Sequence, residues 1–168
     1  MRTLRFRSAA ICLAAAVGCM SCRRTPETKS VSAPAARDSL TGIVAVTGTS
    51  FEKRLVLRSG QRSTTLSASA SDSASLTRVS GTEVRVRGQA NSDAFLVSSF
   101  TVVSVDTRPV VDGVLRNDGA KVLLETAHGR MSLGNPPAAL RALAGARVWV
   151  GGPLDVGPNV YGIITPPR

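Results

Sequence analysis

Two short stretches of the chain share one pattern, in which alternating valines lie between glycines. The first stretch is Gly81–Gly88 and the second is Gly145–Gly152. Alternation with a period of two is typical of a strand that buries one face, so Val84 and its equivalent Val148 are predicted to point inward. These two valines lie 64 residues apart. The sequence therefore predicts that the second half of the chain repeats the first.

The first copy is predicted over residues 40–106 and contains a short helix at about 73–80. Its strands are expected at 40–48, 52–58, 62–66, 82–88 and 94–105. The second copy is predicted over residues 107–168, with strands at 110–116, 121–126, 130–133, 146–151 and 159–165. Its helix is expected to have Asn135 as N-cap, Pro136 at the first helical position and Gly145 at its end.

The order of five strands with a helix between the third and fourth is that of the OB-fold, a small Greek-key barrel. Gly42 and Gly113 occupy the same place in the two first strands, where such a barrel must curl. With the pattern of residues 76–88 and 140–152, each copy resembles the OB-like modules of unknown function found in exported bacterial proteins. The fold class predicted is therefore all-β, with two tandem five-stranded OB-fold-like barrels. One continuous barrel or sandwich of eight to ten strands is the alternative.

The amino terminus indicates export. Residues 1–7 carry three arginines, and residues 8–18 form an uncharged run that is too short to span a bilayer. The run ends in Ala16–Cys19, which resembles the lipobox of bacterial lipoproteins and implies a diacylglyceryl thioether on Cys19. Residues 1–18 are then a lipoprotein signal peptide. A plain secretory signal is the alternative.

Residues 19–39 are predicted to be a flexible linker, because they mix Pro, Ser, Thr, Ala and charges without periodicity. Cys22 lies in this linker, either as a free thiol or in an intermolecular bridge. Met20 stands where enteric lipoproteins retained in the inner membrane carry Asp. The resemblance therefore implies a lipid-anchored protein of the bacterial cell envelope, with the periplasmic face of the outer membrane favoured.

The formal net charge is +10, but the basic residues are spread along the predicted strands, and only 4% of residues are aromatic. Binding of single-stranded nucleic acid relies on aromatic stacking, so no nucleic acid is expected as partner. The only histidine, His128, falls in a predicted hairpin turn, and Asp112, Asp118 and Asp155 fall in different turns. No catalytic residue, metal site or cofactor is therefore predicted, and the chain is not expected to be an enzyme.

Trp149 breaks the strand pattern, because it lies between two inward valines and so faces outward. Either it packs against the other copy or the last strand, or it contacts a ligand or partner protein. By analogy with the binding face of OB-folds, the other candidate contact residues are Arg54, Arg58 and Arg62 in the first copy and Lys121 and Arg130 in the second, with the loop at 153–158. We expect an envelope interaction or assembly module. The alternative is a module that binds an oligosaccharide or another small envelope molecule.

Overall fold

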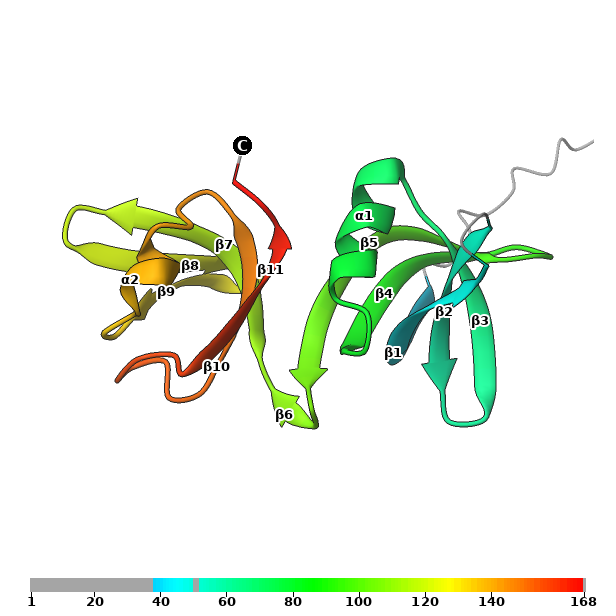
Figure 1. The fold of residues 1–168 in the computed structure, drawn as a ribbon, viewed down its shortest axis with the longest axis horizontal. Coiled ribbons are helices and arrows are strands. Elements are labelled where there is room, and N and C mark those ends of the chain that lie inside the picture. Colours follow the sequence, from blue (N-terminus) through cyan, green and yellow to red (C-terminus); the bar gives the residue numbers. More distant parts are fainter. Residues whose placement is uncertain (1–37, 50–51, 168) are drawn as a thin grey trace, which may run out of the picture. The chain divides into compact units, whose positions relative to one another are not determined.

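The computed structural model describes residues 38–49 and 52–167. The predicted signal peptide, Cys19 and Cys22 lie outside the described residues, as does most of the predicted linker. The described residues form two separate β-sheets, the first within residues 38–109 and the second within residues 111–165 (Figure 1). One continuous barrel is therefore wrong for this part of the chain, and the single sandwich is wrong as well, because the described residues form a separate core cluster for each sheet.

The first sheet closes into a five-stranded barrel, as predicted. Its elements are β1 (Asp38–Gly48), β2 (Lys53–Ser59), β3 (Arg62–Ser67), α1 (Ala70–Arg78), β4 (Glu83–Ala90), β5 (Phe95–Val105) and the short β6 (Arg108–Pro109). The strand order is β3-β2-β1-β4-β5-β6. Leu66 and Ser67 at the end of β3 pair in parallel with Phe95 and Leu96 of β5, and this pairing joins the two ends of the five-stranded sheet.

Two local features explain how the first barrel forms. A Cβ atom on Gly42 would lie 2.4 Å from the carbonyl oxygen of Arg58, so only glycine lets β1 pass this close to β2. The helix α1 begins three residues before the predicted start, because the Ser69 side chain accepts a hydrogen bond from the backbone N–H of Asp72 and caps it.

The second sheet repeats the strand order of the first. Its elements are β7 (Val111–Asp118), β8 (Lys121–Thr126), β9 (Gly129–Leu133), α2 (Ala138–Arg141), β10 (Arg147–Gly151) and β11 (Val160–Thr165). The order β11-β10-β7-β8-β9 corresponds to β5-β4-β1-β2-β3. The helix differs from its prediction, since α2 has only four residues and Pro137, not Asn135, as its N-cap. The prediction that Gly145 ends the helix is also wrong, because α2 ends at Arg141 with Ala142 as its C-cap, and Gly145 lies in the following turn with a φ of +86°.

The equivalence of the two copies extends to the register of individual residues. Val84 pairs with Gly42, and Val148 pairs with Gly113. Both valines have 0% exposure. A Cβ atom on Gly113 would lie 2.5 Å from the Glu125 carbonyl oxygen, which repeats the close approach at Gly42. Both sheets also contain a β-bulge just before the first inward valine, after Glu83 in β4 and after Arg147 in β10. The predicted internal repeat therefore describes the backbone correctly.

The second sheet does not close, which corrects the prediction of two barrels. No pairing joins β9 to β11 among the described strands, and β11 has 6 residues where β5 has 11. The loop between β10 and β11 lies beside the end of β9 instead, where Gly134 and Asn135 donate backbone hydrogen bonds to the carbonyls of Leu154 (2.8 Å) and Val156 (2.9 Å). A loop thus takes the place that the start of β5 has in the first barrel.

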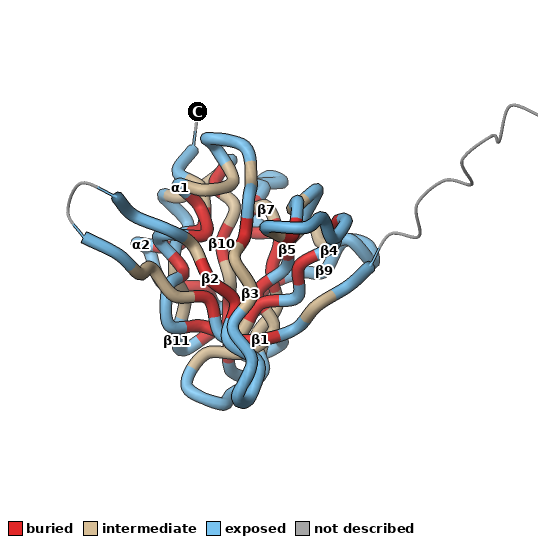
Figure 2. Tube along the Cα trace, turned by 90° about the vertical axis from the view of Figure 1, so that its right-hand side faces the viewer, coloured by how far each residue is buried: buried red, intermediate tan, exposed pale blue. Residues whose placement is uncertain are grey.

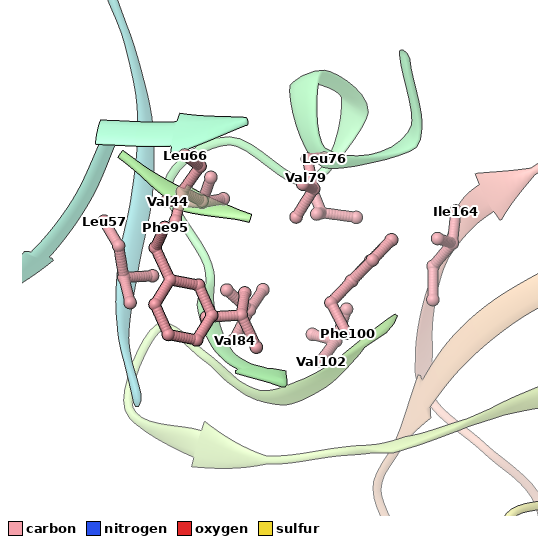
Figure 3. Packing of buried hydrophobic residues seen from close by; sticks show 11 residues of the cluster. Val44, Leu57, Leu66, Leu76, Val79, Val84, Phe95, Phe100, Val102 and Ile164 are labelled. Atoms are coloured by element: carbon pink, nitrogen blue, oxygen red, sulfur yellow. The ribbon is translucent and has the colours of Figure 1, made fainter. Parts of the chain in front are cut away.

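Each sheet has its own hydrophobic core. Buried and exposed residues alternate along the strands, so that red and blue segments follow each other in Figure 2. The second core is built around Leu115, Leu124, Leu140 and Val148, all with 0% exposure. The first is built around Val44, Leu76, Val84 and Phe95, but it also contains Ile164 from β11 of the second sheet. Figure 3 shows Ile164 in this cluster with Phe100 and Leu76. The two sheets are therefore in apolar contact.

Candidate functional site

An ion pair on the outer side of the second sheet contacts the first module. Arg147 of β10 donates two hydrogen bonds to Asp112 of β7, at 2.9 Å and 2.8 Å. Asp112, whose side chain is 3% exposed, also accepts the backbone N–H of Val102 in β5 at 2.9 Å. The guanidinium lies 4.4 Å from the centre of the Phe100 ring. The bond from Val102 and the contact of Arg147 with the Phe100 ring cross between the sheets, whereas the Asp112–Arg147 bonds hold these two side chains in place within the second sheet.

Trp149 belongs to the same contact. It pairs with Gly162 of β11, and its indole lies where a Cβ atom on Gly162 would be, 2.5 Å from the nearest ring atom. Its side chain is partly buried and packs against the first core cluster. Ser75 of α1 and Thr165 of β11 add a hydroxyl hydrogen bond of 3.0 Å. The tryptophan thus packs on the last strand, one of the two surfaces named in the sequence prediction, and on the core cluster that Ile164 of that strand shares with the first module.

The equivalent side of the first barrel is exposed and carries arginines. Val84 and Val86 are buried inside the barrel, so Arg85 and Arg87, which alternate with them along β4, point outward. Arg58 lies on the outer side of β2, where it pairs with Ile43 of β1. All three arginines are exposed and form no ion pair within the described residues. We call Arg58, Arg85 and Arg87 the arginine face.

Exposed aliphatic and hydroxyl side chains accompany the arginine face. Ile43, with 49% exposure, pairs with both Arg58 and Glu83. Leu96, with 43% exposure, pairs with Gln89, two positions beyond Arg87 on the outer side of β4. Cross-strand neighbours of Arg85 and Arg87 are hydroxyl residues, namely Ser39, Thr41, Ser99 and Thr101. The nearest acid, Glu83, accepts a hydrogen bond from Ser104 Oγ at 2.7 Å.

The structure separates the candidate residues of the first copy. Arg58 belongs to the arginine face, whereas Arg54 forms an exposed ion pair with Glu52 that lowers the pKa of this carboxyl through a hydrogen bond from the guanidinium. Arg62 pairs with Ser59 next to the turn between β2 and β3, in phase with the inward Leu66. Sequence reasoning missed Arg85 and Arg87 as members of this surface, although their alternation with buried valines was a signal for it.

The candidates of the second copy lie elsewhere. Lys121 begins β8 and is exposed. Arg130 of β9 and Arg116 of β7 both bind Glu125, and the hydrogen bond from Arg116 is the main cause that lowers the pKa of the Glu125 carboxyl. The loop at 153–158 packs against the end of β9 through Leu154 and Val156. These residues form no common surface with Trp149, which lies in the contact between the modules.

Two shallow grooves indent the first barrel. The larger, of about 570 Å³, lies between the start of β1, β3 and the loop at 91–94, and is lined mainly by Ser39, Ser63, Thr64, Asn91, Ser92 and Asp93. Asn91 Oδ1 accepts hydrogen bonds from the backbone of Asp93 and Ala94, which fixes that loop. The smaller groove, of about 440 Å³, lies between β2, β3 and α1. The larger groove offers hydroxyl and amide groups to a polar molecule.

The other candidate chemistry from the sequence is not assembled into a site. His128 is exposed in the turn between β8 and β9, where its backbone N–H binds Thr126 Oγ1. Asp112 is engaged with Arg147, and the described residues contain no group of three metal-binding side chains. Within the same residues, no helix has the length and hydropathy needed to cross a membrane.

Comparison with known proteins adds no family to this description, because no family model, curated protein or solved structure matches the chain.

Proposed function

We propose that the chain is a lipid-anchored lipoprotein of the bacterial cell envelope and acts as a non-enzymatic interaction module. The observation that carries the proposal is the different use of one surface in two equivalent modules. In the second module this surface is covered by the first, and in the first module it is exposed and carries Arg58, Arg85 and Arg87. A fixed pair of modules with one uncovered strand surface is suited to bind a partner.

We further propose that both modules derive from the OB-fold. The strand order of each sheet and the helix between its third and fourth strands support this, as do the matched glycines Gly42 and Gly113. The second module would then be an OB-like sheet in which a loop replaces the closing pairing. OB-folds bind ligands through strand surfaces and adjoining loops, which agrees with an exposed strand surface as the binding site.

The proposed anchor is the lipid on Cys19, supported by the uncharged run before it and the Ala16–Cys19 pattern. Two or more acyl chains hold a protein stably on a membrane, whereas a single chain gives reversible binding. The 19 residues from Cys19 to Arg37 would let the first module reach at most about 65 Å from the bilayer when fully extended. The module would therefore act in the periplasm, close to the membrane that anchors it.

Metabolic labelling with a radioactive fatty acid tests the anchor. The unchanged chain should be labelled and should fractionate with membranes, and the Cys19→Ala chain should lose both properties. A matched Cys22→Ala chain should remain labelled, because the pattern before Cys22 is a poorer lipobox than the one before Cys19. Equal labelling of the Cys19→Ala and unchanged chains would refute the anchor.

A second candidate function is favoured by the larger groove, whose volume of about 570 Å³ falls in the usual range of small-molecule sites, about 300–1,000 Å³. Its hydroxyl and amide lining suits a neutral oligosaccharide. The test is the melting temperature of the chain with and without cell-wall oligosaccharides at saturating concentration. A rise that is abolished by Ser63→Trp, which fills the groove, would support this function, and the absence of any rise would exclude it for these sugars.

A further inference from the structure

We propose that the arginine face of the first module lies against an anionic membrane surface. The inference rests on the proposed lipid anchor and deepens it, because it names the surface that the anchored module meets. The phosphate groups of anionic lipids are the ligand chemistry, and Arg58, Arg85 and Arg87 are the groups that bind them.

Equivalent positions of the two modules carry different side chains. Arg85 of β4 is flanked by Thr41 and Thr101, whereas the equivalent Trp149 of β10 is flanked by Asp112 and Gly162. The second surface contacts the first module through Ile164, through Asp112, which accepts the Val102 N–H, and through Arg147, which lies over the Phe100 ring. The first surface has the same backbone but presents a guanidinium among hydroxyl groups. It is therefore suited to a wet, anionic surface and not to an apolar protein contact.

Charged and aliphatic side chains lie in one row on the arginine face. Arg85 and Arg87 are two residues apart on β4, about 7 Å along the strand. Ile43 and Leu96 are exposed at opposite ends of this row, beside Glu83 and beside Gln89. A surface on which isolated aliphatic side chains flank arginines matches the boundary between lipid headgroups and acyl chains, where both kinds of group are accommodated.

The chain joins the first barrel at the edge of the arginine face. Asp38 begins β1 opposite Gly88, and Ser39 pairs with Arg87 itself. The segment that follows the proposed lipid on Cys19 therefore reaches the fold at the edge of the arginine face. An anchor attached there tethers the first module directly, whereas the second module is tethered only through the first.

The expected strength follows from the charges. A basic residue near an anionic membrane contributes about 1 kcal/mol, which is about five-fold in the partition coefficient for each arginine. The Arg85→Gln/Arg87→Gln double variant should therefore bind about 25-fold more weakly. Because this attraction is screened over about 8 Å at physiological ionic strength, charges on other sides of the molecule contribute little.

Co-sedimentation with vesicles tests the inference. We would use residues 19–168 with Cys19→Ala, which contain both sheets and both core clusters but cannot be lipidated. The vesicles contain either phosphatidylcholine alone or equal parts of phosphatidylcholine and phosphatidylglycerol. The Lys53→Gln/Arg116→Gln double variant is the control: it removes the same charge, from the opposite side of β2 and from the second module. Melting curves check that all variants fold.

The chain should bind only the anionic vesicles, the Arg85→Gln/Arg87→Gln variant should lose about 25-fold in binding, and the control should stay within about two-fold. Equal losses in both variants would overturn the inference, because net charge alone would then explain binding. Equal binding to neutral vesicles, no binding to either kind, or binding only to a soluble polyanion such as heparin would overturn it too. Fatty-acid labelling of Cys19 is independent of these results, so failure here leaves the proposed anchor standing, and failure of labelling refutes the anchor alone.

Discussion

The buried pair between Asp112 and Arg147 gives the sharpest prediction about how the modules are held together. Asp112→Ala removes the acceptor of two bonds from Arg147 and one from the Val102 N–H. Removal of one partner of a buried pair costs about 3–5 kcal/mol, since the other charge stays buried without a counter-charge. The Arg147 side chain is 27% exposed, so water reaches the guanidinium and the loss in unfolding free energy should lie at the lower end, about 3 kcal/mol.

Urea unfolding followed by circular dichroism measures this loss. Asp112→Asn should lose less than Asp112→Ala, because the amide oxygen still accepts the Val102 N–H. A double-mutant cycle with Arg147→Ala isolates the pair, and contacting charged residues of this kind should show a coupling free energy of about 2 kcal/mol. Glu125→Ala is the surface comparison, and its loss should be much smaller, because its partners Arg116 and Arg130 are 57% and 72% exposed. A coupling below about 0.5 kcal/mol would refute the reasoning.

Three other predictions follow from the packing and the charges. Ile164→Ala should lower the free energy of unfolding by about 2–4 kcal/mol. It should also speed amide hydrogen exchange at Val44 and Val84 in the first sheet, because Ile164 belongs to that core, and faster exchange confined to the second sheet would contradict this. Gly42→Ala and Gly113→Ala should each lower the free energy of unfolding by about 2–3 kcal/mol, because the new Cβ would lie 2.4 Å or 2.5 Å from a carbonyl oxygen. Gly60→Ala is the control: no atom lies within 4 Å of its Cβ, so only the left-handed backbone cost of about 1 kcal/mol should appear. Equal losses at all three positions would be evidence against the close approach. The hydrogen bond from Arg116 lowers the pKa of Glu125 below its ordinary value of 4.5. The charged Glu125 therefore stabilises the fold above pH 4.5, and this stabilisation is lost as the pH falls through the lower pKa of the folded state. In urea titrations Glu125→Gln should lose less stability below pH 4.5 than the unchanged chain does, and the same pH dependence in both would disprove this contribution.

Residue patterns predicted the strands and the repeat because both depend on local alternation. The alternation predicted that Val84 and Val148 point inward, and both are buried. It also predicted that Gly42 and Gly113 are equivalent, and at each of them a neighbouring carbonyl oxygen lies too close for a Cβ atom. The closure of a barrel depends instead on pairing between distant residues. The second sheet stays open because β11 is short and because Gly134 and Asn135 donate hydrogen bonds to the loop at 152–159. Alternation of residues along the chain predicts neither of these features.

The contact between the modules was also beyond sequence reasoning. Trp149 could be assigned to the outer side of its strand, but its neighbours there, Gly162 and Ile164, are set by the register with β11 and its bulge. Asp112 was predicted to serve in a turn, whereas it binds Arg147, 35 residues away. The arginine face was missed for the same reason, since Arg58 joins Arg85 and Arg87 only through the pairing of β1 with both β2 and β4.

The central claim is that the outer side of the second sheet is covered by the first module, and Trp149, the only tryptophan of the chain, reports on it. The most direct test is quenching of its fluorescence by iodide in the native chain and along a urea titration. The account predicts that Trp149 is shielded in the native chain and becomes accessible in the same transition in which the β-sheet signal is lost. Native quenching as strong as that of free N-acetyltryptophanamide would contradict it.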